Sequence, residues 1–206
     1  APGSYLANLL VSDGHGGSIG GQVTVTINAV NQAPTVATAA KASPNPVTGT
    51  STSLTVLGAD DGGEAGLTYS WSTTGVPPAS VAFSLNGTNA AKNTTANFTK
   101  AGSYSFQVTL KDAGGLSVTS SVVVTVNQTL TTIVVSPGSA SVSAGGTQQF
   151  TATAKDQFGT ALASQPVFTW TASSGSTVSA TGLFTKGPLT VRAAAAGKSG
   201  TASVTP

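Results

Sequence analysis

Hydrophobic and polar residues alternate along most of the chain, which is the pattern of half-buried β-strands. Residues 22–27, for example, place two Val and one Ile on one face and Gln and Thr on the other. Short clusters of Gly, Asn, Asp and Pro separate such segments, and no stretch shows a helical stripe. The alanines at 193–196 follow Thr190-Val191 and precede Gly197, which favours a strand of small residues. The pattern therefore predicts an all-β protein.

The chain repeats itself at a shift of 99 residues. Gly3-Ser4-Tyr5 returns as Gly102-Ser103-Tyr104, and Asp13 returns as Asp112. The same shift relates Val23, Val25, Thr26 and Asn28 to Val122, Val124, Thr125 and Asn127. A period of this length indicates a string of similar domains. We expect the chain to open on the last two strands of one domain and to continue through complete ones.

Three segments follow from the repeat and from the spacing of the turns. Residues 1–30 are a hairpin with its turn at residues 13–17, residues 31–128 are a β-sandwich of about seven strands, and residues 129–206 are a second sandwich. Neither Gly nor Pro occurs in residues 127–130, so we expect a strand-like connection there.

The middle segment resembles bacterial immunoglobulin-like domains of the polycystic-kidney-disease (PKD) type. The resemblance rests on Asn-Gln-Ala-Pro at residues 31–34, Tyr-Ser-Trp at 69–71 and Ala-Gly-Ser-Tyr-Ser-Phe at 101–106. It implies that Trp71 fills the space between two sheets and that the Tyr104 hydroxyl ties a corner to nearby backbone.

The last segment resembles the bacterial Ig-like group 2 (BIG2) domain. The matching stretches are residues 133–137, 145–152, 168–170 and 180–185. The leading hairpin looks like the end of a cadherin-like or PKD-like repeat. These families occur in large secreted or cell-surface bacterial proteins, as adhesin stalks and as spacers beside carbohydrate-active enzymes. The resemblance thus implies an extracellular or cell-surface location.

Composition excludes several classes of function. Charged residues make up 7% of the chain, against about 25% in ordinary soluble proteins. The eight basic residues are scattered, so no stripe follows a nucleic-acid backbone. There is no cysteine for disulfides or thiolate metal sites. No apolar run reaches the roughly 18 residues of a membrane span.

Nothing in the sequence predicts an enzyme. His15 is the only histidine, and its neighbours Ser12 and Asp13 lie in the same glycine-rich turn, whereas a catalytic triad converges from separate elements. Asp60 and Asp61 are adjacent in one loop, unlike the facing carboxylates of a glycosidase. We predict a non-catalytic chain.

The scarce acidic residues carry the one candidate for binding chemistry. On the sandwich interpretation all six fall in loops at the end of a module that faces the preceding module. Asp60, Asp61, Glu64 and Asp112 are then a candidate calcium set near residues 31–34, since calcium takes 6–8 oxygen ligands. The alternative is that these residues form ordinary solvated turns, and no other cofactor is expected.

The aromatic residues are expected in cores. Trp71 and Trp170 lie within apolar alternation, so we assign them to core packing rather than to a sugar-stacking platform. The predicted structural core includes Tyr69, Trp71, Tyr104, Phe106, Phe150 and Trp170.

Two functions remain at this point. The first is a structural module acting as stalk, spacer or fibre subunit. Because a lone hairpin is barely stable and exposes its edges, residues 1–30 need a partner. Preceding Ig-like strands or a neighbouring copy would fit, and strand addition between copies would make a homopolymer. The second function is a carbohydrate-binding or adhesion module, attached to a secreted polysaccharide-degrading enzyme and meeting a glycan or cell-surface ligand.

Overall fold

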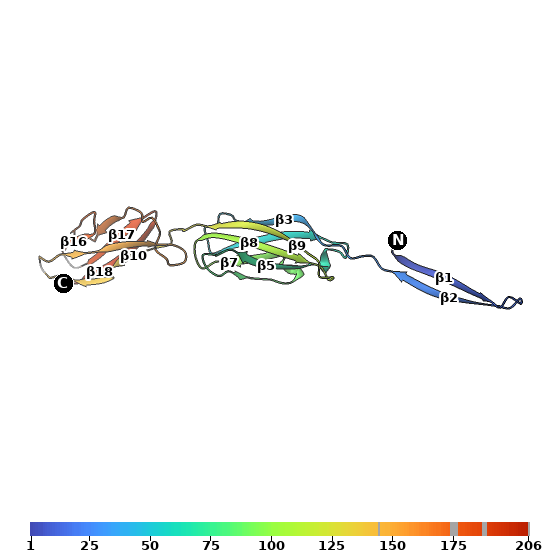
Figure 1. Cartoon of the computed structure of the whole chain (residues 1–206). Coiled ribbons are helices and arrows are strands. Elements are labelled where there is room, and N and C mark those ends of the chain that lie inside the picture. Colours follow the sequence, from blue (N-terminus) through green and yellow to red (C-terminus); the bar gives the residue numbers. More distant parts are fainter. Residues whose placement is uncertain (144, 174–176, 187–188, 206) are drawn as a thin grey trace.

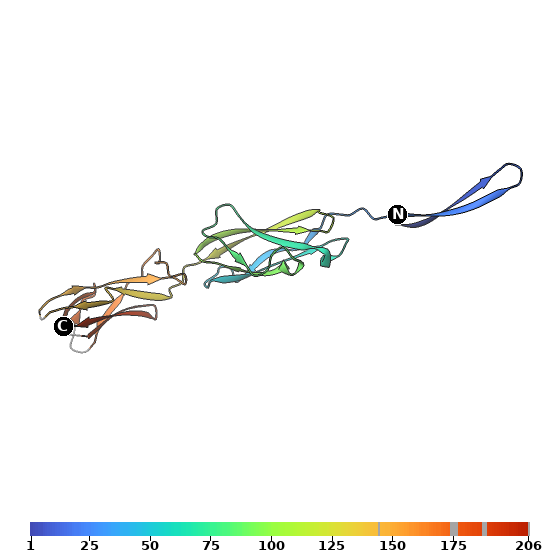
Figure 2. The ribbon, with the colours of Figure 1, turned by 90° about the horizontal axis from the view of Figure 1, so that it is seen from below.

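The computed structural model describes residues 1–143, 145–173, 177–186 and 189–205, and it consists of β-strands in three successive bodies. Figures 1 and 2 show these bodies following one another in an extended row. The first is a hairpin, and the other two are sandwiches with a sheet on each side of a core. The all-β class with tandem Ig-like sandwiches is confirmed.

The hairpin consists of β1 (Gly3–Ser12) and β2 (Ser18–Ile27). The strands of the middle sandwich are β3 (Thr35–Ser43), β4 (Ser51–Ala59), β5 (Thr68–Thr74), β6 (Ala82–Phe83), β7 (Asn93–Asn97), β8 (Gly102–Lys111) and β9 (Ser117–Val126). Its two short 3-10 helices are Glu64–Gly66 and Asn89–Lys92.

The described strands of the third sandwich are β10 (Thr132–Ser136), β11 (Ser139–Ser141), β12 (Gln148–Gln149), β13 (Thr151–Lys155), β14 (Thr169–Ala172), β15 (Thr177–Val178), β16 (Leu183–Lys186), β17 (Leu189–Ala195) and β18 (Lys198–Thr205). The described part of this sandwich thus has more and shorter strands than the seven that the sequence predicts. The alanine-rich segment is a strand, as expected.

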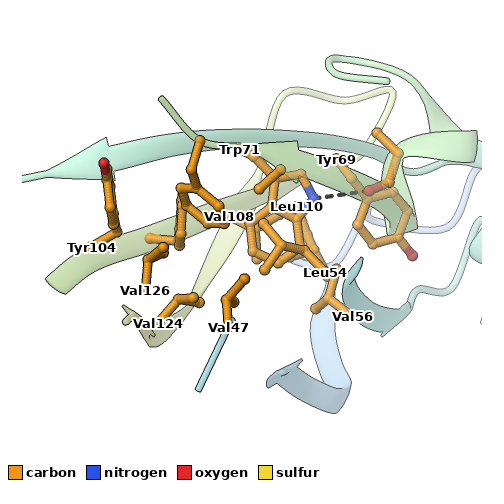
Figure 3. Close-up of a cluster of buried hydrophobic side chains, with 14 of the residues drawn as sticks. Val47, Leu54, Val56, Tyr69, Trp71, Tyr104, Val108, Leu110, Val124 and Val126 are labelled. Atoms are coloured by element: carbon orange, nitrogen blue, oxygen red, sulfur yellow. Dashed lines mark hydrogen bonds between the residues drawn. The ribbon is translucent and has the colours of Figure 1, made fainter. Parts of the chain in front are cut away.

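The middle sandwich places sheet β3-β4-β7-β6 against sheet β5-β8-β9. Alternate residues of β8 face inward, and Tyr104, Phe106, Val108 and Leu110 are at most 1% exposed. Figure 3 shows Trp71 and Tyr69 beside Val108 and Leu110 in this core. The indole Nε1 of Trp71 donates to the Ala91 carbonyl at 2.8 Å, so the buried ring keeps its polar group satisfied.

The hydroxyl of Tyr69 connects β5 to the end of β4. It accepts a hydrogen bond from the Gly58 N–H at 3.0 Å and donates to Glu64 Oε1 at 2.9 Å. A Cβ on Gly58 would lie 2.6 Å from Leu67 Cδ1 and 2.7 Å from Leu110 Cδ2. The absence of a side chain at Gly58 therefore allows β4 to approach the core closely enough for this contact.

The described strands of the third sandwich form three sheets, two of which are β10-β13 and β12-β16-β15. Strands β11, β18, β17 and β14 form the other sheet, with β11 parallel to β18. Phe150 and Phe184 meet edge to face in the core at a centroid distance of 6.4 Å. A Cβ on Gly200 would collide with the Ile133 carbonyl oxygen. Glycine is thus what permits β18 to pass close to β10.

The hairpin is a second copy of β8–β9. Strands β1 and β2 pair from Gly3↔Ile27 to Ser12↔Ser18, and β8 and β9 pair from Gly102↔Val126 to Lys111↔Ser117. Every pair is shifted by 99 residues. The corner is also copied, because Tyr5 Oη donates to the Ala1 carbonyl at 2.7 Å and Tyr104 Oη to the Lys100 carbonyl at 2.8 Å.

The two tyrosines give a matched test of packing. Tyr104 is fully buried, whereas Tyr5 is 46% exposed. We expect Tyr104→Phe to lower the free energy of unfolding of the middle sandwich by about 0.5–1.5 kcal/mol, because the Lys100 carbonyl loses the hydroxyl that donates to it from the buried ring. Tyr5→Phe, in which water replaces the lost contact, should change nothing measurable. Urea denaturation checks both, and equal losses in the two variants would contradict the assignment.

Candidate functional site: the module junctions

The acidic residues lie in loops at one end of each of the three bodies. Asp13 and Asp112 begin the turns of the hairpin and of β8–β9, while Asp60, Asp61 and Glu64 follow β4, and Asp156 follows β13. Several of them contact the linker that enters their own module. We call residues 28–34 the first junction and residues 127–131 the second junction.

Two side chains hold the first junction. The Asn31 amide donates to Asp112 Oδ2 at 2.9 Å, and the Gln32 N–H donates to Asp61 Oδ1 at 3.2 Å. The other oxygen of Asp112 accepts the Leu116 N–H at 2.8 Å and thereby closes its own turn. Asp112 therefore joins the β8–β9 turn to the linker.

The second junction repeats this arrangement. The Gln128 amide donates to Asp156 Oδ2 at 3.0 Å, and the Thr129 N–H donates to Gln157 Oε1 at 2.8 Å. Asp156 Oδ1 accepts the N–H groups of Phe158 and Thr160, both at 2.9 Å. Again one carboxylate holds its own turn and the incoming linker together.

The second junction also reaches back to the middle sandwich. Gln157 Nε2 donates to the Asn127 carbonyl at 2.7 Å and to the Gly49 carbonyl at 3.1 Å. Phe158, half-buried, packs against the core cluster of the middle sandwich. The third sandwich is thus fastened to its neighbour by an amide and by an aromatic ring.

A two-residue difference separates the two junctions. The Asp60 turn and the Asp156 turn follow equivalent strands, and each is closed by an N–H···O bond of 3.0 Å from the glycine three residues on. Asp61-Gly62 stands in the first turn where Gln157-Phe158 stands in the second. A carboxylate only accepts hydrogen bonds, whereas an amide also donates. The first turn therefore lacks the groups that reach back.

Sequence reasoning placed Asp61 and Asp112 near the first junction, but it missed the residues that they bind and the role of Gln157 and Phe158 at the second junction. The signal was available in the alignment of Asp-Asp-Gly-Gly (60–63) with Asp-Gln-Phe-Gly (156–159) and in the amides Asn31 and Gln128 before each module. The expectation of a strand-like second junction is wrong, since residues 127–131 belong to no strand. Side chains from the third sandwich supply the order that a β-ladder would have supplied.

The hydrogen bonds set the acidity of both anchoring carboxyls. Burial raises the pKa of Asp156, but the Gln128 amide and the N–H groups of Thr160 and Phe158 outweigh it and bring the pKa below its usual 3.8. Burial also raises the pKa of Asp112, and the Asn31 amide with backbone N–H groups lowers it further than burial raises it. Both side chains are therefore ionised at neutral pH.

Glu64 is a structural support rather than a free ligand. Lys92 Nζ lies 2.8 Å from Oε2 and 3.0 Å from Oε1, and the Tyr69 hydroxyl and the Asn89 amide also donate to Oε1. The Lys92 ammonium is the main cause that lowers the pKa of Glu64. Asp60 Oδ2 accepts the Gly62 N–H at 3.1 Å, and its Oδ1 is buried without a partner among the described residues.

The four residues of the candidate calcium set do not converge in this structure. Across the described residues, no group of three or more His, Cys, Asp or Glu side chains is placed to hold a metal ion. Calcium at the first junction stays a prediction, and calcium titration of the melting temperature in the wild type and in Asp112→Asn tests it. A rise confined to the wild type would establish the site.

The other candidate residues close a turn or pack in a core. The N–H groups of His15 and Gly17 donate to Asp13 Oδ1 at 2.8 and 2.9 Å, so Asp13 closes an exposed turn. Trp71 is buried, and Trp170 is half-buried against the core of the third sandwich. Of the aromatic residues in the described ranges, Tyr5 alone is classed as exposed. The described surface therefore shows no platform of exposed rings.

Comparison with known proteins identifies the domain type. The family described as K319L-like, PKD domain matches residues 45–126. These residues thus resemble an immunoglobulin-like domain of the PKD type, and their fold is shared with cadherin domains. Such domains are typically non-catalytic, extracellular modules with structural or adhesive roles. No curated protein matches the chain in sequence. Within the described ranges, no helix is long and apolar enough to cross a membrane.

Solved structures share the fold at low sequence identity. Drosophila N-cadherin EC1-4 matches with a TM-score of 0.55 at 14% identity, covering 98% of this chain and 57% of its own. The human desmocollin-1 ectodomain matches with a TM-score of 0.53 at 12% identity, over 98% and 46%. Mouse cadherin-23 EC22-24 matches with a TM-score of 0.50 at 18% identity, over 98% and 72%. The chain thus spans about half the length of the first two.

Gln157→Glu tests the second junction. The change keeps the size and the accepting oxygen of the side chain but removes the two donors that face Asn127 and Gly49. We expect the coupling between the two sandwiches to weaken by about 1–3 kcal/mol, because two carbonyls each lose a hydrogen bond worth about 0.5–1.5 kcal/mol and then face a charge. In differential scanning calorimetry, the unfolding transitions of the middle and third sandwiches should lie further apart in the variant than in the wild type. Gln148→Glu, in β12 of the same sandwich, is the matched control and should leave the profile unchanged, because among the described residues the Gln148 side chain bonds only the carbonyl of its neighbour Gln149.

Acid should weaken both junctions. A carboxyl whose folded pKa is lowered contributes stability above its unfolded pKa and loses it as the pH falls through the folded value. For Asp112 and Asp156 the loss of stability begins as the pH falls to the usual carboxyl pKa of 3.8, and it continues at lower pH. We expect the melting temperature to fall below pH 4, and to fall less steeply in Asp156→Asn than in the wild type. Parallel profiles would show that Asp156 contributes nothing.

Proposed function

We propose that this chain is a non-catalytic structural segment of a secreted or cell-surface bacterial protein, in which Ig-like sandwiches in a row act as stalk or spacer. The observation that carries the proposal is the second junction. A spacer transmits length and direction only if its modules hold a fixed angle to one another. Gln157 and Phe158 supply that restraint by binding the preceding module directly.

We assign the third sandwich to the BIG2 type within this proposal. The motif at residues 145–152 supports the assignment, since it contains Phe150, which packs against Phe184 in the core. The composition, with few charged and many hydroxyl side chains, also suits a protein outside the cell. A chain with only eight Lys and Arg residues offers few tryptic sites to proteases.

Small-angle scattering tests the stalk. The wild-type chain should scatter as an elongated particle whose middle and third sandwiches hold one relative orientation. Phe158→Ala combined with Gln157→Glu should broaden the distribution of intramolecular distances without unfolding either sandwich. Val167→Ala, at a 94% exposed position of the third sandwich, is the control. A flexible wild type, indistinguishable from the double variant, would refute a stiff spacer.

A carbohydrate-binding or adhesive role is the second candidate. A shallow groove at the second junction favours it, because Lys100, Ser103, Asn127, Asp156 and Thr160 line it with polar groups. Hydroxyl-rich ligands bind through such groups. Binding to a glycan array that is lost in Lys100→Ala would support this role, whereas an array without signal leaves the stalk as the function.

A fibre subunit is the remaining version of the stalk, in which copies join by strand complementation. The exposed apolar face of the hairpin supports it. Its signature is a native mass that increases with protein concentration. A constant monomer mass excludes it.

A further inference from the structure

The hairpin exposes a face that its copy in the middle sandwich buries. Its register places the following side chains on one face: Tyr5, Ala7, Leu9, Val11, Ile19, Val23, Val25 and Ile27. All of them are exposed, with Leu9 at 65% and Val23 at 58%. The equivalents in the middle sandwich on β8 are at most 1% exposed. Continuous apolar faces of this kind mark interaction surfaces.

The chain itself shows what covers such a hairpin. Strand β5 pairs antiparallel with the outer edge of β8, from Thr68↔Lys111 to Thr74↔Ser105. The opposite sheet contributes Leu54, Ala96 and Phe98 to the same core cluster. Because the hairpin has the same register, the same corner bond and the same Asp-closed turn as β8–β9, the same kind of cover fits it.

We propose that β1–β2 is the docking surface for an Ig-like set of strands that lacks its own last two strands. One strand of this partner pairs antiparallel with the free edge of β1, from Leu6 to Ser12, which is the register that β5 takes on β8. The partner's second sheet packs on the apolar face. This inference rests on the chain being a row of Ig-like modules and not on the stiffness of its junctions.

The substitutions between the two hairpins define the partner further. Ala7 stands where Phe106 stands in the middle sandwich, and Phe106 packs against the rings of Phe83 at 5.9 Å and Phe98 at 6.3 Å. The partner must fill the space with larger side chains opposite Ala7. Gly21 replaces Ser120, whose Oγ accepts the Ala40 N–H at 2.9 Å. Gly21 has no side-chain oxygen, so the backbone N–H of the partner at this position must find its acceptor within the partner itself.

The folded middle sandwich of a second copy does not supply the β5-like strand of this cover. Its β5 already pairs with β8 on one edge, and residues 86–88 occupy the other edge. The Tyr69 N–H donates to the Thr88 carbonyl at 3.1 Å, and the Asn86 side chain bonds both the N–H and the carbonyl of Trp71 at 2.7 and 2.9 Å. The strand that would fit β1 is thus not available in the folded middle sandwich.

A hybrid chain tests the proposal. The repeat equates Ala1 with Lys100, so residues 31–99 are placed directly before Ala1 of the full chain. We expect one additional cooperative unfolding transition, and we expect amide exchange at Leu9 and Val25 to slow by roughly tenfold or more relative to the 206-residue chain. Ala7→Phe in the hybrid should raise the melting temperature of the new transition, because the ring fills the space that Phe106 fills in the original.

The controls separate the outcomes. Leu9→Asp in the hybrid should abolish the new transition, whereas Asn8→Asp, on the opposite face of β1, should retain it. If the hybrid with Ala7 does not fold, the Ala7→Phe hybrid is used for the same measurements. Fast exchange of the hairpin amides in both hybrids overturns the proposal. A stable dimer of the 206-residue chain with protected hairpin amides also overturns it, since a second copy would then be the cover. If the stalk proposal is wrong, small-angle scattering will show two sandwiches that move freely about the second junction. The results of the hybrid chain do not depend on that outcome.

Discussion

The arrangement of this chain depends on a carboxylate that serves two segments at once. Asp112 and Asp156 each use one oxygen to close their own turn and the other to hold an amide of the incoming linker. A hydrogen bond to an ionised group is stronger than one between neutral groups, and both carboxyls are largely removed from solvent. The path by which each linker enters its own sandwich is therefore fixed.

The junctions differ in whether the module that follows also contacts the module before it. Gln157 and Phe158 do so in the second junction, and Asp61 and Gly62 have no corresponding groups in the first. The same scaffold thus supports a tight joint and a looser one by changing two loop residues. Neither Gln157 nor Phe158 packs into the core of its own sandwich, so such changes cost little in the stability of that sandwich.

The sequence predicts the sandwiches well because alternation and turn residues act locally. The 99-residue echo even predicts the register of the hairpin, since paired strands with equal turns keep equal pairing. It also places the acidic residues in the correct loops. It does not predict the partners of these residues. Glu64 meets Lys92 and Asn31 meets Asp112 through contacts between distant segments. Gln157 stands out in the sequence only when its loop is aligned with residues 60–63, and even then the carbonyls that it binds cannot be named.

The residues that seal the outer edge of β5 have a consequence for a chain built of similar units. Neighbouring sandwiches of related sequence are held at high local concentration, and an open strand edge on one would invite mispairing with the next. Asn86 and Thr88 cover that edge with side-chain and backbone bonds. By keeping like domains from joining edge to edge, this short loop lets a row of relatives fold as separate units.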